Sequence, residues 1–184
     1  MVKFKNDNLG KLFIEGMERT EAFEKDLGFY LGSNWKNYQI RDSVSEYLAH
    51  LKYLSDNDPD LLMAYVYHLY MGLLSGGQIL RKKMDLQRKI FGNSNDQNGR
   101  AVTDFGEHKI ADLKNELKQR MNDIADNLDD EKKALLIEES KKVFECNNSI
   151  IKTVQGANQV LLYNVLLVGI TIIFIFLVLK YFVL

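Results

Sequence analysis

The segment that decides the fold is Tyr67–Leu80, which reads YHLYMGLLSGGQIL. Its apolar pattern is typical of the middle of a long helix, yet it contains Gly72, Gly76 and Gly77. Each glycine inside a helix costs roughly 1 kcal/mol of stability relative to alanine. Gly72 and Gly76 are one helical turn apart and share a face, where their missing side chains leave a notch. The notch predicts either a tight crossing with another helix or a surface on which a flat ligand lies against the backbone.

Helical periodicity extends outward from this segment to most of the chain, and we find no convincing strand pattern or repeat. The predicted helices are Thr20–Gly32 with a stripe of Ala22, Phe23, Leu27, Tyr30 and Leu31; Asp42–Leu54 with Val44, Tyr47, Leu48, Leu51 and Leu54 inward; Pro59 to about Ile90; Asp104 to about Asn127; and Asp129 to beyond Ile151. The sequence therefore predicts an all-α fold.

Aspartates mark three of the expected helix starts. Asp58 is a predicted N-cap, with Pro59 at the first helical position, where its missing N–H is harmless. Asp104 and Glu107 have the spacing of a capping box. Asp129 is expected to cap the last helix before the C-terminal region.

The C-terminal region contains twenty nearly unbroken apolar residues, Val160–Leu179, followed by Lys180. A helix of this length crosses a hydrocarbon core of roughly 30 Å. Tyr163 and Tyr181 lie near its two ends, where aromatic rings favour the membrane interface. The alternative is a buried core helix. We expect a helical domain over residues 1–159, facing the cytosol, and a single-pass tail anchor over residues 160–182.

The remaining composition excludes several classes of protein. The chain has 24 Lys and Arg residues against 25 Asp and Glu residues, so it has no general basic field for nucleic acid. Cys146 is the sole cysteine. It excludes an internal disulfide and a cysteine-based metal cluster, and it suits a reducing compartment.

The stretch YVYHLYMGLLSGGQIL resembles the distal helix of the heme oxygenases, whose hallmark is Tyr-x-Gly-Asp-Leu-Ser-Gly-Gly-Gln. The matching residues are Tyr70, Gly72, Leu74, Ser75, Gly76, Gly77 and Gln78. The flanking segments EAFEKDLGFYLGSNW, LKNELKQRMND and EESKKVFECNNSI are also similar to parts of that family, so the resemblance covers about Ile14 to Ile151.

This resemblance implies a helical domain in which heme, as substrate and cofactor, lies between two helices. The implied activity is oxidative cleavage of heme to biliverdin, carbon monoxide and ferrous iron, with electrons from NADPH through a flavin-containing reductase. It also implies a location at the cytosolic face of the endoplasmic reticulum membrane.

The resemblance assigns roles to individual residues. Tyr67, Lys114 and Lys118 match positions that bind the heme propionates, although the family usually has arginine where Lys118 stands. Phe144 matches an aromatic residue against the ring, and Asn147 matches a member of the distal water network. Gly72, Leu73 and Gly76 line the oxygen site. Without the resemblance, Lys114 and Lys118 are explained equally well as a solvated helix face, and Tyr67 and Phe144 are better explained as core residues.

The chain departs from the family pattern in its histidines. The family's proximal helix, with its iron-ligating histidine, precedes the EAFEKDLG segment, and none of His50, His68 and His108 precedes Ala22. We therefore expect an N-terminally shortened domain with weaker heme binding and lower activity. His68 shares the notch face and is a conceivable substitute ligand, although a lone helical histidine is more often a packed residue. His50 and His108 are expected on the surface.

The second departure is Leu73, which stands where the family has an aspartate that orders the waters delivering protons to the oxygen site. Leucine neither donates nor accepts a hydrogen bond. The hydroxyl of Tyr65 is a possible partial substitute. Three functions follow: a heme-cleaving enzyme of reduced activity, a non-catalytic heme-binding or heme-sensing membrane protein, or a membrane-anchored helical adaptor without heme.

Overall fold

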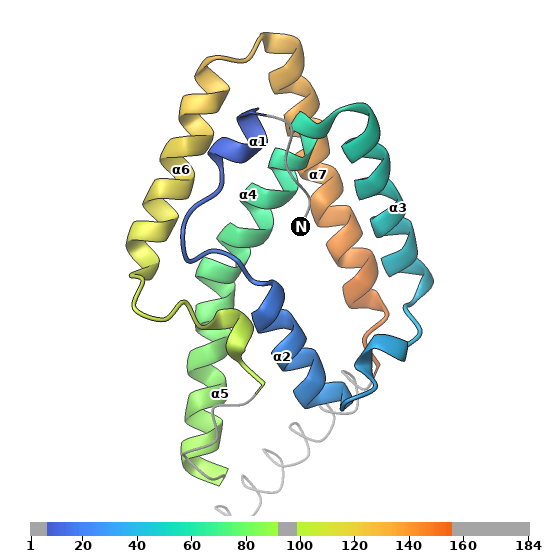
Figure 1. Ribbon diagram of the computed structural model, residues 1–184, viewed down its shortest axis with the longest axis vertical. Coiled ribbons are helices and arrows are strands. Elements are labelled where there is room, and N and C mark those ends of the chain that lie inside the picture. Colours follow the sequence, from blue (N-terminus) through green and yellow to red (C-terminus); the bar gives the residue numbers. More distant parts are fainter. Residues whose placement is uncertain (1–6, 92–98, 156–184) are drawn as a thin grey trace, which may run out of the picture. The chain divides into compact units, whose positions relative to one another are not determined.

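The computed structural model describes residues 7–91 and 99–155, and all their regular structure is helical (Figure 1). The elements are α1 (Asp7–Lys11), α2 (Thr20–Leu31), η1 (Trp35–Asn37), α3 (Asp42–Asn57), η2 (Pro59–Leu61), α4 (Leu62–Gly72), η3 (Leu73–Gly77), α5 (Gln78–Phe91), η4 (Ala101–Thr103), α6 (Ile110–Asp126) and α7 (Asp130–Lys152). The predicted all-α class is confirmed.

The chain divides into two compact units, Met1–Cys146 and Asn147–Leu184, with the boundary inside α7. Among the described residues, no helix combines the length and the apolar character that crossing a membrane requires. The predicted anchor over residues 160–182 lies outside the described residues. The division into a helical domain over 1–159 and an anchor stays a prediction.

In the first unit, α4 and η3 occupy the centre (Figure 1). Helix α6 packs along α4 and η3, α1 packs against α4 and α6, and α3 packs against α4 and η2. The core is apolar, and its most completely buried large side chains are Met63, Leu74, Leu117 and Val143, which come from α4, η3, α6 and α7. Burial of these side chains fixes the helices that surround the notch.

The predicted long helix from Pro59 to about Ile90 is present as the succession η2, α4, η3 and α5. Its middle is not regular α-helix, because Leu73–Gly77 forms a turn of π-helix. Single π turns inside α-helices are uncommon and occur frequently at functional sites. Gly76 therefore lies in a local widening of the helix that the sequence pattern did not indicate, and Gly72 directly precedes it.

Of the three predicted helix starts, one is confirmed and two need correction. Asp129 caps α7 as expected, because its Oδ1 accepts a hydrogen bond from the backbone N–H of Lys132 at 2.7 Å. Asp58 does not cap a helix with its side chain. Its carboxylate instead pairs with the Lys132 ammonium group at 2.6 and 2.8 Å, and Pro59 begins a short 3-10 turn.

The predicted capping box is also wrong, because α6 begins only at Ile110. Oδ1 of Asp104 accepts a hydrogen bond from the backbone N–H of Gly106 at 3.0 Å, and Oδ2 pairs with Arg81 at 2.9 Å. The pKa of the Asp104 carboxyl is lowered, and its hydrogen bond with Arg81 is the main cause. Asp104 therefore joins the loop before α6 to α5 instead of starting a helix.

The apolar stripe predicted for α2 is largely exposed. Its large members retain a third or more of their accessible surface: Phe23 48%, Leu27 36%, Tyr30 59% and Leu31 42%. The buried residue of α2 is Asp26, whose carboxylate accepts hydrogen bonds from the backbone N–H groups of Ala101 and Val102 at 2.8 and 2.9 Å. Helix α2 thus holds η4 with a buried charge instead of an apolar face.

Helix α3 follows its predicted pattern only in part. Tyr47 and Leu54 are buried as predicted, whereas Leu48 is 52% exposed.

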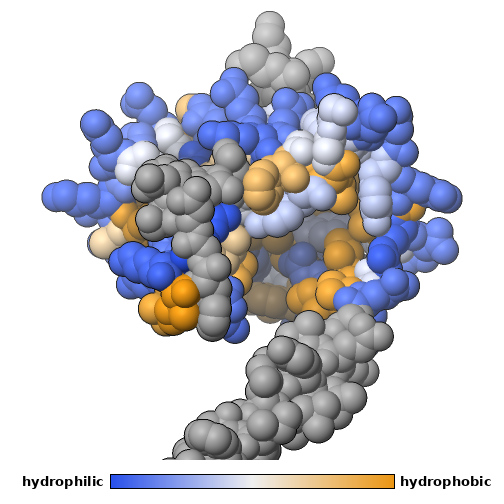
Figure 2. Space-filling view, turned by 90° about the horizontal axis from the view of Figure 1, so that it is seen from below, coloured by the Kyte–Doolittle hydropathy of each residue, from blue (hydrophilic) through white to orange (hydrophobic). Residues whose placement is uncertain are grey.

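Seen from below, the first unit has a hollow bordered by hydrophobic side chains (Figure 2).

Candidate functional site

The notch on the central helix is open. Gly72 and Gly76 are exposed, and a Cβ atom added to either one would meet no described atom within 4 Å beyond its own stretch of helix. Gly77 differs, because a Cβ atom there would lie 3.4 Å from Cγ2 of Thr103. The tight helix crossing that we considered as an alternative is therefore not formed at Gly72 or Gly76 by the described residues. The missing side chains leave free space, which is what a flat ligand requires.

Aromatic rings from two helices lie one turn before the notch. Tyr67 and His68 of α4 are half-buried, and the His68 ring lies edge-on to the Phe144 ring of α7, with centroids 5.1 Å apart. The Tyr67 and His68 rings are 5.3 Å apart in the same type of arrangement. Phe144 is 56% exposed, so it is not a core residue. Its ring is available to a ligand on the surface of α4.

The environment of His68 is apolar. Burial lowers the pKa of its imidazole, which favours the neutral ring. The contacts of the His68 ring with Tyr67 and Phe144 favour the interpretation of His68 as a packed residue over that of a substitute iron ligand. The rings of His68 and Phe144 join α4 to α7 beside the notch.

The two lysines assigned to propionate binding lie on the neighbouring helix α6. Lys114 is half-buried and Lys118 is exposed, and they are one turn apart. Leu113 and Leu117, the residue before each lysine, are buried and hold α6 in place. Helix α6, which carries both lysines, packs along α4 and η3, the two elements that form the notch. Asn147 is a half-buried residue of α7 in the second unit.

Leu73 is the first residue of the π turn and is half-buried. Its Cδ2 atom lies 3.7 Å from the position that a Cβ atom of Gly77 would occupy. The side chain brings no polar atom to this turn. The hydroxyl of Tyr65 does not replace one, because Tyr65 is buried and donates a hydrogen bond to Oε1 of Glu139 at 2.5 Å.

Sequence reasoning missed the polar cluster that contains Tyr65. Nε2 of His50 lies 2.6 Å from the same Glu139 oxygen, and 27% of the His50 side chain is exposed, so His50 is half-buried and the prediction of a surface residue is only partly correct. His108 is exposed as predicted. Burial raises the pKa of Tyr65, with a further increase from its hydrogen bond to Glu139, and burial raises the pKa of Tyr47 to about 12. No sequence spacing indicates this cluster, because its members come from three helices.

The turn that follows the notch is held by polar contacts with η4. The Gln78 amide donates to the backbone oxygen of Thr103 at 2.9 Å, and Arg81 pairs with Asp104. Gln78 belongs to the motif Leu-Ser-Gly-Gly-Gln, so this contact gives the last residue of the motif a structural role. It fixes the position of the glycine turn relative to η4.

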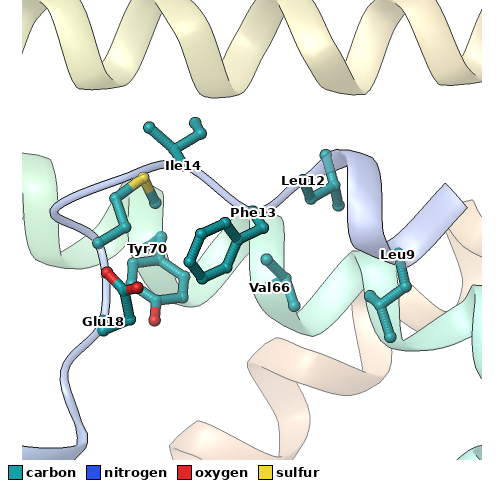
Figure 3. A pocket seen from close by; sticks show the side chains of 8 residues that line it. Leu9, Leu12, Phe13, Ile14, Glu18, Val66 and Tyr70 are labelled. Atoms are coloured by element: carbon teal, nitrogen blue, oxygen red, sulfur yellow. The ribbon is translucent and has the colours of Figure 1, made fainter. Parts of the chain in front are cut away.

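A small apolar cavity of about 150 Å³ lies at another part of α4 (Figure 3). It is lined by Leu9, Leu12, Phe13, Ile14, Met17 and Glu18 of the N-terminal segment and by Val66 and Tyr70 of α4. Neither glycine of the notch lines it. Tyr70, a residue of the motif, therefore contacts the N-terminal segment.

These features define an all-helical domain with an open glycine notch on its central helix, flanked by aromatic rings and next to a helix that carries two lysines. The chain belongs to the heme oxygenase family, because the family model for heme oxygenase matches residues 2–153.

Curated relatives and solved structures agree with this assignment. The chain is 32% identical to heme oxygenase 2 of Oryctolagus cuniculus over 148 residues, which cover 78% of this chain and 45% of the relative. It is 30% identical to heme oxygenase 1 of Synechocystis over 161 residues, which cover 85% of this chain and 63% of the relative. The crystal structure of the Synechocystis heme oxygenase-1 in complex with heme superposes with a TM-score of 0.74 at 28% identity, covering 89% of this chain and 74% of that one. The chain spans about half the length of the mammalian relatives that it matches.

Proposed function

We propose that this chain binds heme with the porphyrin ring against the notch formed by Gly72 and Gly76. The observation that carries this proposal is the free space at both glycines, where an added Cβ would have no described atom within 4 Å outside its own stretch of helix. A side chain at either position would occupy the space that a flat ring needs for contact with the backbone. Heme, when bound, supplies a redox-active iron that activates oxygen.

Residues of α4, α6 and α7 suit the two ends of such a ligand. The exposed ring of Phe144 offers an apolar face. Tyr67, Lys114 and Lys118 offer one hydroxyl and two ammonium groups, which bind carboxylates such as the heme propionates through charge-assisted hydrogen bonds. Lys118 gives a point charge where an arginine would give two parallel hydrogen bonds.

The proposed reaction is that of the family: oxidative cleavage of heme to biliverdin, carbon monoxide and ferrous iron, with electrons from NADPH through a flavin-containing reductase. Leu73 brings no hydrogen-bonding group to the π turn, so ordered waters at the notch have no carboxylate partner there. We therefore propose that the chain cleaves heme at a reduced rate. Favourable placement of a proton donor is typically worth a factor of about 10² to 10⁴ in rate.

A second candidate function is heme binding or sensing without cleavage. The specific observation that favours it is again Leu73 in the π turn, together with the packing of His68 between two aromatic rings. Both candidates require heme in the notch. They differ in whether bound heme is converted.

We also propose that the chain is held at the cytosolic face of the endoplasmic reticulum membrane by a helix over residues 160–182. The support for this proposal is the length and apolar character of Val160–Leu179.

Titration of the full chain in detergent micelles with hemin tests the first proposal. We expect saturable uptake with a shift of the Soret band. Addition of reductase and NADPH under air then separates the two candidates, because cleavage releases biliverdin and carbon monoxide, whereas a binding protein returns its heme unchanged. Absence of any saturable uptake would exclude both candidates and favour the adaptor.

A further inference from the structure

Helix α5 carries a narrow aliphatic stripe on its exposed surface. Ile79, Leu86 and Ile90 retain 71%, 59% and 61% of their accessible surface. They are spaced by seven and four residues, so they lie on the same side of the helix within about 40° of arc. Three large aliphatic residues in one exposed row on a helix are more than scattered surface apolarity, and they call for a partner.

Lysines border this stripe on both sides. Lys82 and Lys89 lie on one border and Lys83 on the other, by the helical period of about 100° per residue. All three are exposed. An aliphatic row with cations along both edges is the pattern of a helix that lies in the interface of an anionic lipid membrane. There the lysine stems cover apolar surface and their ammonium groups reach the headgroups.

The opposite side of α5 holds it to the rest of the unit. Arg81 pairs with Asp104, and Asp85 pairs with Arg100. Apart from these contacts, the main backbone packing of α5 among the described elements is with η3, which precedes it. Helix α5 extends from the end of α4 away from α1 and α6 (Figure 1). One side is thus anchored by ion pairs, and the side with the stripe is left open.

We propose that the stripe of α5 docks on an anionic lipid surface. A lipid surface fits better than a protein partner because the stripe is purely aliphatic and is bordered by single-sign charge, which matches a uniform anionic plane. The inference rests on the proposed membrane attachment, since a tail in the bilayer would tether the folded domain to the membrane. It assigns a second contact with the membrane, made by the folded domain itself.

The experiment places a fluorescent reporter in the stripe of the full chain. In a Cys146→Ser background, Leu86→Cys carries an environment-sensitive NBD label, and the protein is reconstituted in phosphatidylcholine liposomes with and without 25% phosphatidylserine. Ile137→Cys is the matched control, because Ile137 is 60% exposed on α7 and Leu86 is 59% exposed on α5. Brominated lipids report contact with the acyl boundary, and flotation of the liposomes reports insertion of the tail.

With phosphatidylserine, we expect a blue shift and quenching at position 86 and neither effect at position 137. Replacement of Lys82, Lys83 and Lys89 by glutamine should weaken the contact by roughly a hundredfold, since each lysine near an anionic surface contributes about a fivefold factor. High salt should weaken it in the same way.

The inference is overturned if position 86 behaves like position 137 in anionic liposomes that carry the floated protein. It is also overturned if the label at position 86 responds only when the reductase is added, since α5 would then be a protein-docking helix. Failure of flotation contradicts the tail anchor instead. The heme proposal is tested by the Soret band and is not involved in any of these outcomes.

Discussion

The hydroxyl of Tyr65 on α4 donates a hydrogen bond to Oε1 of Glu139 on α7, and Nε2 of His50 on α3 lies 2.6 Å from the same oxygen. One carboxylate oxygen therefore joins three helices. Glu139 is five residues before Phe144 on α7, so the contact also positions the helix that brings Phe144 to the notch. A buried hydrogen bond of this kind is costly to break, because the remaining partner stays buried.

Tyr65→Phe should lower the free energy of unfolding by about 1.5–3 kcal/mol, the range for a hydrogen bond to a charged group. The matched control is Tyr53→Phe, because Tyr53 lies on α3 and is 61% exposed. It should change stability by less than about 0.5 kcal/mol. Urea unfolding of the full chain in detergent, followed by circular dichroism, measures both. Equal stability of the two variants would show that the Tyr65–Glu139 bond contributes nothing.

Replacement of the notch glycines should move stability and heme binding in opposite directions. Gly72→Leu and Gly76→Leu remove the penalty of glycine in a helix and meet open space, so each should stabilise the fold by about 0.5–1 kcal/mol. The same side chains fill the proposed heme surface, and hemin affinity should fall at least roughly tenfold, a loss of about 1.4 kcal/mol. Thermal unfolding and hemin titration give the two measurements.

Gly10→Leu is the control for this pair, because Gly10 of α1 is also exposed with no atom within 4 Å of an added Cβ. It tests the helix effect alone and should leave hemin affinity unchanged. If the notch variants bind hemin as tightly as the parent chain, the ligand does not lie against these glycines.

The glycine notch could be predicted from sequence because it depends on residues four apart on one helix. The same holds for the cap at Asp129, which bonds to a backbone group three residues later. These features depend on local geometry, and local geometry follows from spacing.

The contacts that support the site could not be predicted in this way. Glu139 meets His50 across 89 residues, and Asp26 binds backbone groups 75 and 76 residues away. The burial of Asp26 follows from two backbone donors in η4, so hydrophobic periodicity selected the wrong face of α2. The glycines of Leu73–Gly77 indicated a notch, but their spacing did not indicate that the turn is a π-helix.

Leu73→Asp should increase heme cleavage. A carboxylate at this position provides the hydrogen-bonding group that Leu73 lacks, so waters at the notch would gain an ordered acceptor for proton delivery. The rate of biliverdin formation in a single turnover with reductase and NADPH should rise by at least about tenfold, a part of the factor of roughly 10² to 10⁴ that a well-placed proton donor contributes. Leu73→Asn keeps the shape and a polar group without the titratable carboxylate, and it should give a smaller gain. An unchanged yield in both variants would favour the non-catalytic binding protein.

His68 should make stability depend on pH in a direction set by its burial. Its pKa in the folded chain lies below the ordinary value of 6.5, so the unfolded chain takes up a proton more readily as the pH falls. The folded state is therefore fully stabilised above about pH 6.5 and loses stability as the pH falls through the lower folded pKa. His68→Phe keeps an aromatic ring against Tyr67 and Phe144 and removes the titrating group.

The measurement for His68 is the free energy of unfolding of both proteins between pH 7.5 and pH 5.0, from urea titrations at each pH. The stability of His68→Phe relative to the parent chain should rise steadily as the pH falls. All other titrating groups are present in both chains, so their contributions largely cancel in the difference. A difference that is constant across this range would mean that the imidazole is not held in its neutral form, and that the aromatic enclosure by Tyr67 and Phe144 does not exclude water from it.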